Sequence, residues 1–319
     1  MITKILNLKY VHLSLSAFIV LGALVCVFPP DFFLFKIGAQ FAVQIMLSYM
    51  AFGLIFLMLN SYRLMFTSFI CCAGLCLFLK YTTNSDMAPA QASNEETIEV
   101  AHFNISATDD YQFMVDQILL SGADLVSLQE VTPDWNIVLQ ESLNTIYPYS
   151  KTVVRFDPFG MAVYSKLPLT NLDTFVCEGV PNIMGTVELK NTGKDICFIT
   201  SHALPPFYSG DYKKLRKHLR RIADFSNESS CPVLTMGDYN AVPWSYEIQD
   251  FRSASNLNDS RRGFFPNSVG SFSVFQLPSD HIFYSKDLKC IQFEDMDDPT
   301  AGHIGVKGAY QFTPKYSSL

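Results

Sequence analysis

Uncharged apolar runs fill the first quarter of the chain and then stop. No charged residue occurs in residues 11–30, 37–62 or 64–79. A membrane-spanning helix needs about 20 apolar residues, which the first two runs supply. The third run has 16 residues, but Arg63 and Lys80 flank it, and their side chains can extend so that the charges reach the membrane surface. We therefore predict a membrane anchor over residues 1–80 with three transmembrane helices, at about 11–30, 37–60 and 64–80.

Two other interpretations of these runs agree less well with their number and length. Lys4 and Lys9 precede the first run, as in a cleaved secretory signal, but such a signal does not account for two further apolar runs. A buried hairpin of soluble helices would rarely contain 26 successive uncharged residues, which is the length of the run 37–62. The composition also fits a membrane segment, because charged residues make up only 17% and the mean hydropathy is +0.18.

The charges that flank these helices favour one orientation by a small margin. Basic residues concentrate on the cytoplasmic side of membrane proteins. An N-terminus inside the cell places Lys4, Lys9 and Arg63 there, against Lys36 and Lys80 outside. The domain that follows would then lie on the extracytoplasmic side.

Beyond residue 80 the pattern changes twice. Residues 81–96 are polar and acidic without any basic residue, which is typical of a linker. From residue 97, short apolar runs bounded by turn residues predict strands at 97–105, 124–128, 161–165, 195–200, 232–236, 281–285 and 306–312. Apolar side chains at helical spacing predict helices at 110–121 and 211–225. This alternation predicts an α/β domain over residues 97–319, with sheets covered by helices.

Polar and charged residues gather where the predicted strands meet loops. They are Asn104, Gln129, Glu130, His202, Asp238, Asn240, Asp280, His281 and His303. Each one alone is consistent with a turn residue, but scattered turn residues seldom place so many histidines and carboxylates at strand ends. Glu130 suits a hard cation such as Mg²⁺, which binds carboxylate oxygens together with substrate phosphate. His303 with Asp280 suits a general base, because a carboxylate can hold an imidazole in one tautomer. The set therefore favours hydrolysis of a phosphoester.

Six features in a fixed order resemble one known protein family. They are Asn104, LVSLQEV at 125–131, FGMAVYSKLPL at 159–169, TSHALPP at 200–206, MGDYNAVPWS at 236–245 and LPSDHIFYS at 277–285. In this order they resemble the endonuclease/exonuclease/phosphatase superfamily over residues 98–312. SRRGFFPNS at 260–268 is similar to its bacterial branch with N-terminal membrane helices. The resemblance implies a four-layer α/β/β/α sandwich (DNase I-like) behind the three transmembrane helices, in a bacterial inner membrane.

The resemblance also implies catalytic roles by position. His202 would contact the scissile phosphate, Asp238 would orient or activate the attacking water, and Asn240 would help to bind phosphate. His303 would be the catalytic histidine and Asp280 its carboxylate partner.

The implied metal site lacks one expected carboxylate. Asn104 and Glu130 would hold the metal, Mg²⁺ or Mn²⁺, with Glu130 as the central ligand. The final motif of the family is Ser-Asp-His, whereas this chain has Ala301-Gly302-His303. The segment EDMDD at 294–298 lies just upstream, and a solvated acidic loop is the favoured interpretation; the alternative is that Asp295, Asp297 or Asp298 replaces the carboxylate. Fewer anionic ligands weaken cation binding, which leaves open an alternative function as a membrane-tethered module that binds a phosphorylated ligand.

The sequence constrains the substrate less. The whole chain has 23 basic and 30 acidic residues, of which 5 basic and 4 acidic ones lie in positions 1–96. The predicted domain therefore has 18 basic and 26 acidic residues, and its net charge of −8 disfavours nonspecific binding to nucleic acid. The basic stretch 213–221 is most consistent with a solvated helix face; the alternative is a helix that faces anionic lipid or another polyanion near the site, because it closely follows His202. Arg261 and Arg262 are candidate substrate ligands, because an arginine fork binds phosphate well. Phospholipid head groups, nucleotides and nucleic acids all remain possible substrates. Predicted loops carry aromatic residues such as Phe156, Phe207 and Tyr208, which suit contacts with lipid or bases. No protein partner is evident from the sequence.

The cysteines do not settle the compartment. Cys177, Cys197, Cys231 and Cys290 lie in the predicted domain without the spacing of a metal site. Their even number permits disulfides, but Cys197 and Cys231 lie in or beside apolar runs, so we expect buried free thiols there.

Overall fold

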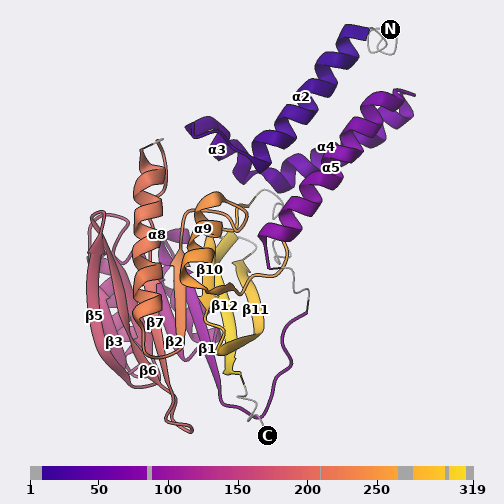
Figure 1. Ribbon diagram of the computed structural model, residues 1–319. Helices are drawn as coiled ribbons and strands as arrows, with labels where there is room; N and C mark the ends of the chain where they lie inside the picture. Colours follow the sequence, from indigo (N-terminus) through magenta and orange to yellow (C-terminus); the bar gives the residue numbers. More distant parts are fainter. Residues whose placement is uncertain (1–8, 85–87, 209, 265–275, 299–301, 314–319) are drawn as a thin grey trace, which may run out of the picture.

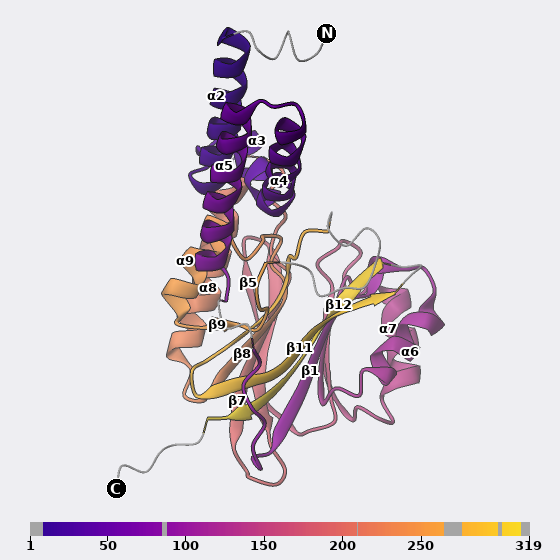
Figure 2. The ribbon, with the colours of Figure 1, turned by 90° about the vertical axis from the view of Figure 1, so that its right-hand side faces the viewer.

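The anchor is a group of helices that stands on one end of a two-sheet domain (Figures 1 and 2). The computed structural model describes residues 9–84, 88–208, 210–264, 276–298 and 302–313. The anchor helices are α2 (Lys9–Val27), α3 (Phe33–Gln40), α4 (Ala42–Met58) and α5 (Tyr62–Thr82). Two stretches, Tyr10–Val27 and Tyr62–Thr82, are long and apolar enough to cross a membrane. The continuous helix predicted at 37–60 is wrong: α3 and α4 are bent by 69° to one another, and together they make a third candidate span.

Two six-stranded sheets form the domain. The first has the order β11-β12-β1-β2-β4-β3, made of β11 (Leu288–Asp298), β12 (Gly302–Phe312), β1 (Thr97–Asn104), β2 (Leu125–Gln129), β4 (Met161–Ser165) and β3 (Tyr149–Val153). The second has the order β5-β6-β7-β8-β10-β9, made of β5 (Leu169–Cys177), β6 (Val180–Glu188), β7 (Asp195–Ser201), β8 (Val233–Asp238), β10 (Asp280–Tyr284) and β9 (Asn258–Asp259). All seven predicted strands are present, and β3, β5, β6, β9 and β11 are additional.

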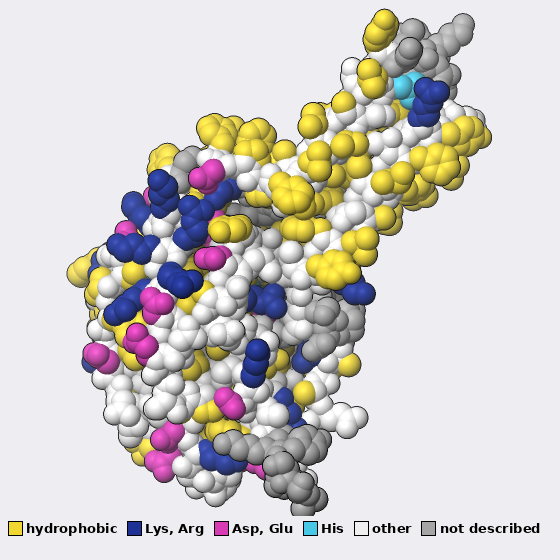
Figure 3. All heavy atoms as spheres, viewed as in Figure 1, with side chains coloured by type: hydrophobic (Ala, Val, Ile, Leu, Met, Phe, Trp, Pro, Cys, Tyr) yellow, Lys and Arg dark blue, Asp and Glu magenta, His cyan; other side chains and the backbone are white. Residues whose placement is uncertain are grey.

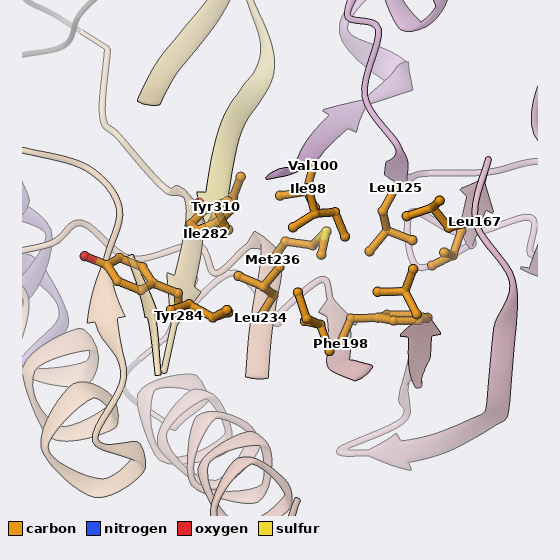
Figure 4. Packing of buried hydrophobic residues seen from close by; sticks show 14 of the residues in the cluster. Ile98, Val100, Leu125, Leu167, Phe198, Leu234, Met236, Ile282, Tyr284 and Tyr310 are labelled. Atoms are coloured by element: carbon orange, nitrogen blue, oxygen red, sulfur yellow. The ribbon is translucent and has the colours of Figure 1, made fainter. Parts of the chain in front are cut away.

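Helices cover the outer faces of both sheets. The first sheet carries α6 (Tyr111–Leu120) and α7 (Pro133–Leu143), and the second carries α8 (Asp211–Glu228) and α9 (Tyr246–Ser255). A short 3₁₀ helix, η1 (Ile105–Ala107), follows β1. Side chains from the inner faces of the two sheets interdigitate, among them Val100, Leu125, Phe198, Leu234 and Met236 (Figure 4). The predicted four-layer α/β/β/α sandwich is therefore confirmed.

The anchor packs directly on the domain. Val242 and Trp244 of the domain belong to the same apolar cluster as anchor residues such as Leu79. Trp244 Nε1 donates to the carbonyl of Ala39 (3.1 Å), and Arg252 Nη1 donates to the carbonyl of Thr82 (2.9 Å). The contact is therefore both apolar and polar, which fixes the domain at the end of α5.

The segment predicted as a linker lies against the first sheet. Ala90 N donates to the carbonyl of Cys290 (3.3 Å), and Ser93 N donates to Gln311 Oε1 (2.9 Å). These bonds join residues between the anchor and β1 to β11 and β12. The segment thus adds to the attachment of the domain.

Cys197 and Cys231 form a disulfide, with 5.6 Å between their Cα atoms. The expectation of free thiols is therefore wrong. Cys197 lies on β7, and its N–H donates to the carbonyl of Pro232 (2.8 Å), so the parallel pairing of β7 with β8 brings Cys231 beside it. This pairing was not visible in the apolar pattern.

Candidate active site

The topology brings the ends of several strands to one end of the sandwich. Asn104 at the end of β1 pairs with Gln129 at the end of the parallel strand β2. Asp238 at the end of β8 pairs with Asp280 at the start of the antiparallel strand β10. Ends of parallel strands meet at one edge, which is where binding sites of α/β sheets usually form.

Asn104 and Glu130 form the first pair of this site. Asn104 Nδ2 donates to Glu130 Oε1 (2.9 Å), and Asn104 Oδ1 accepts bonds from the backbone N–H and hydroxyl of Ser106. Glu130 has a φ of 66°, a left-handed conformation that is strained for this residue type and is often found at functional sites. Among the described residues no group of three or more His, Cys, Asp and Glu side chains is placed to hold a metal. One carboxylate with an amide beside it fits Mg²⁺, which keeps several waters and takes further oxygens from substrate, and does not fit a soft metal.

His303 is held between two carboxylates. Its Nε2 lies 2.7 Å from Asp280 Oδ2, and its Nδ1 lies 3.0 Å from Asp297 Oδ1. A carboxylate only accepts hydrogen bonds, so both ring nitrogens carry protons when both bonds are made. Burial alone would lower the pKa of His303, but the bonds to Asp280 and Asp297 outweigh it and raise that pKa to about 10. Burial alone would raise the pKa of Asp280, but the hydrogen bond from His303 outweighs it and holds that pKa below its usual value. His303 is therefore a cation at neutral pH.

Asp297 stands beside the position where the family motif has its aspartate. β11 and β12 pair so that Asp297 lies opposite His303 and Asp298 opposite Gly302. The solvated acidic loop expected at 294–298 is therefore wrong, because these residues continue β11 as a strand. The sequence shows the acidic residues but not the strand pairing that directs one of them at His303.

Asp238 and Asn240 lie on a tightly constrained turn. Asn240 N donates to Asp238 Oδ1 (2.7 Å), and Asn240 itself has a φ of 50°. Asp238 N donates to Gln129 Oε1 (3.2 Å), while Gln129 Nε2 donates to the carbonyl of Ser201 (2.5 Å). A Cβ at Gly237 would lie only 1.9 Å from Ser201 O, so this close approach requires glycine. Burial and the nearby charge of Asp280 raise the pKa of Asp238.

His202 faces the same region from the end of β7. Its Nδ1 donates to the carbonyl of Pro158 (3.0 Å), which fixes the orientation of the ring. Asn240 Nδ2 donates to the carbonyl of Ala203 (2.8 Å), so the loops that carry His202 and Asn240 are joined.

His102 is a site neighbour that the sequence did not reveal. It is buried on β1, with Nε2 3.8 Å from Asp280 Oδ1 and Nδ1 3.3 Å from Ser127 Oγ. Burial lowers the pKa of His102 to about 4, so the ring is neutral. A histidine within an apolar run looks like a core residue, and only the fold places it behind Asp280.

The two arginines predicted to bind substrate are both engaged with protein groups. Arg261 is buried, and its two terminal nitrogens form a fork with the carboxylate of Asp295 (2.5 and 2.7 Å). Arg262 donates to the carbonyls of Ala88 and Cys290. The predicted phosphate-binding role of Arg261 is therefore corrected, because Arg261 neutralises an acidic residue of β11. Arg262 ties the segment before β1 to the domain, and its role at the substrate stays a prediction.

Comparisons with known proteins agree with this fold. Human Nocturnin is similar, with 19% identity over 70% of this chain and 97% of that chain, at a TM-score of 0.54. A mannosyl-6-phosphatase from Bacteroides thetaiotaomicron has 17% identity over 67% of this chain and 100% of its own, at a TM-score of 0.55. Sphingomyelinase C from Streptomyces griseocarneus has 14% identity over 67% of this chain and 99% of its own, at a TM-score of 0.52. No curated protein sequence matches significantly. Residues 101–302 match the Endonuclease/Exonuclease/phosphatase family, and the chain therefore belongs to this family of phosphoester hydrolases.

Proposed function

We propose that this protein is a membrane-anchored phosphoester hydrolase that depends on a divalent cation. The observation that carries the proposal is the convergence of the Asn104–Glu130 pair, the Asp238 turn and the Asp280–His303 pair at one end of the sandwich. A cation site, a proton acceptor and a protonated imidazole are the groups that such a hydrolysis uses.

Asp238 is the group best suited to take the proton of the attacking water. The pKa of Asp238 is raised toward neutral pH, and a general base accepts protons most effectively when its pKa lies near the operating pH. His303 is less suited to that role, because both of its ring nitrogens face carboxylates. We assign it the role of a fixed cation beside the phosphate, because both of its N–H groups are used by the carboxylates. This assignment differs from the general-base role that the sequence suggested for His303.

Glu130, with Asn104 beside it, would hold Mg²⁺ or Mn²⁺. When bound, such a cation neutralises negative charge on the phosphoryl oxygens. His202 Nε2 and Asn240 would position the phosphate at the ends of β7 and β8. The alternative, a binding module with little turnover, is supported by the missing carboxylate at Gly302, but the carboxylate of Asp297 near His303 favours the hydrolase.

Two features support a membrane location with the domain outside the cytoplasm. α2 and α5 expose large apolar side chains along their length, such as Phe18 and Ile70, as expected for helices surrounded by lipid. The Cys197–Cys231 disulfide favours an oxidising compartment, because disulfides seldom persist in the cytosol. We therefore place the domain on the extracytoplasmic side of a bacterial inner membrane.

The test is hydrolysis of bis-p-nitrophenyl phosphate by the full-length protein in detergent, with and without Mg²⁺ or Mn²⁺. His303→Ala and Asp238→Asn should each lower kcat by about a hundredfold or more, because the first removes the fixed cation beside the phosphate and the second removes the proton acceptor. Asp195→Asn is the matched control, because Asp195 is an exposed residue at the other end of β7. Equal rates for the wild type and both site variants would refute the hydrolase assignment.

A further inference from the structure

We propose that the catalytic end of the domain is held against the membrane surface, and that the substrate is a phosphoester in the head group of a membrane lipid. This inference deepens the proposed function and rests on it. It has four supports: the attachment of the anchor beside the site, an exposed aromatic rim, the charge of α8, and a cavity at the junction.

The anchor is seated on the two segments that carry catalytic residues. Val242 lies two residues after Asn240, and Leu277 lies three residues before Asp280. Both pack in the apolar cluster that contains Leu79 of α5. The end of α5, where the chain leaves the proposed membrane, therefore contacts residues that are two or three positions from catalytic residues.

Polar contacts make this attachment specific. Lys36 on α3 forms a buried ion pair with Glu247 on α9 (3.1 Å), and its ammonium lies 4.5 Å from the centre of the Tyr212 ring. Asp31 also pairs with Lys36 (3.0 Å) and Arg216 with Glu247 (3.6 Å), so a network of opposite charges favours one arrangement. The domain is thus held in one orientation, and a site beside the anchor stays close to the bilayer.

Three exposed aromatic side chains lie in the segments that carry Pro158 and His202, and we call them the aromatic rim: Phe156, Phe207 and Tyr208. Their exposed fractions are 95%, 65% and 74%. Phe156 lies two residues before Pro158, whose carbonyl binds His202, and it lines a cavity of about 310 Å³ together with Glu130. Large exposed aromatic residues are costly in water but favourable at the membrane interface. The rim therefore suits insertion among lipid head groups.

The helix that begins after the rim is basic. α8 carries Lys213, Lys214 and Lys217 on its exposed side, although the domain as a whole is acidic. Acidic residues pair with two of them, Asp211 with Lys214 and Glu178 with Lys217. Figure 3 shows these basic side chains gathered over α8, next to the apolar surface of the anchor. A basic surface beside membrane helices attracts anionic lipids.

A cavity of about 660 Å³ lies at the junction and is lined by residues of both the anchor and the domain. Apolar side chains such as Phe28 and Phe78 line it from the anchor, and Arg216 and Trp244 line it from the domain. Its lining combines apolar side chains with charged ones such as Lys36 and Glu247, and a lipid molecule likewise combines apolar chains with a polar head group. The cavity lies beside Ala241, which directly follows Asn240.

Contact with the bilayer can be measured without any activity. The full-length protein is reconstituted in phosphatidylcholine–phosphatidylglycerol vesicles that contain lipids brominated near the head-group end of the chains. Phe156→Trp and Phe207→Trp should gain tryptophan fluorescence that the brominated lipids quench, relative to the wild type with its two tryptophans. Leu120→Trp should not, because Leu120 is as exposed (78%) but lies at the end of α6, next to the start of β2 and away from the site. Absence of quenching at both rim positions would overturn the inference.

Activity then tests the substrate. Phe207→Ser combined with Tyr208→Ser should lower hydrolysis of lipid head groups in vesicles by about tenfold or more, since two interfacial anchors are lost. Hydrolysis of soluble bis-p-nitrophenyl phosphate should stay within about twofold, as for other surface substitutions, and Leu120→Ser should leave both rates unchanged. Hydrolysis of the soluble ester without hydrolysis of any vesicle lipid would refute the lipid substrate and leave the hydrolase standing. A wild type that hydrolyses neither the soluble ester nor any vesicle lipid would instead refute the proposed function.

Discussion

Asp297 offers the sharpest test of how the site works, because it replaces a carboxylate that the family motif leads one to expect at Gly302. Its side chain is 20% exposed and that of His303 is 29% exposed, so water only partly screens the pair. A hydrogen bond to a charged group contributes about 1.5–3 kcal/mol. Since one pKa unit corresponds to about 1.4 kcal/mol, loss of the charge should lower the pKa of His303 by about one to two units.

Two substitutions separate the charge of Asp297 from its contact. Asp297→Asn keeps a hydrogen-bond acceptor for Nδ1 but removes the charge, so the pKa of His303 should fall from about 10 and yet stay above 7, because Asp280 still holds Nε2. We expect kcat at neutral pH to change little, whereas the alkaline limb of the pH–rate profile moves down by about one to two units. Asp297→Ala also removes the orientation of the ring, and a loss of about 1.4 kcal/mol in the transition state lowers kcat about tenfold.

The assay is a pH–rate profile in parallel with NMR titration of the His303 imidazole. Asp287→Asn is the control, because Asp287 is an exposed aspartate in the turn before β11. Stability gives a third readout. The pKa of His303 is raised on folding, so its contribution to stability is complete below its ordinary pKa and is lost as the pH rises through about 10. An alkaline limb and a titration curve that are the same in the wild type and in Asp297→Asn would refute the reasoning.

Two further predictions concern the frame that holds the site. Cys197→Ser opens a disulfide between cysteines 34 residues apart, and the chain-entropy relation predicts a loss of about 3–4 kcal/mol. Thermal unfolding should show it, and a reducing agent should lower the wild-type midpoint but not that of the variant. Leu234→Ala leaves a cavity between the two sheets and should lower the free energy of unfolding by about 2–5 kcal/mol. An unchanged denaturation midpoint would mean that Leu234 is not part of a close-packed core.

The sequence predicts central strands well and peripheral strands poorly. β2 and β4 are buried on both faces, so they appear as continuous apolar runs, and both were predicted within a residue or so. β5 and β11 were missed because polar or acidic residues face solvent along them. The bend between α3 and α4 was missed for a different reason, since an uncharged run gives no information on where a helix turns. These gaps matter little for the fold class, which the central strands decide.

The sequence predicts which residues belong to the candidate site better than it predicts which of them contact one another. Motif order gave Asn104, Glu130, Asp238 and Asp280, which all lie at strand ends. The contacts of Arg261, His102 and Asp297 depend on which strands are neighbours, and periodicity along one segment does not report that. Arg261 was expected at the substrate because its side chain binds phosphate well, yet the fold places Asp295 within reach and the guanidinium is neutralised there.

Asp297 shows how strand register can bring a carboxylate to His303 although the motif residue is absent. Side chains of directly opposed residues on neighbouring strands lie about 5 Å apart, so a carboxylate on β11 can reach an imidazole on β12 as readily as one on the same strand. In this chain the aspartate is absent at Gly302, but the register of β11 brings Asp297 to His303. The two positions are not equivalent, because an aspartate next to His303 in sequence would point to the opposite face of β12. The consequence is a histidine bonded to carboxylates at both nitrogens, which is why we assign the proton transfer to Asp238.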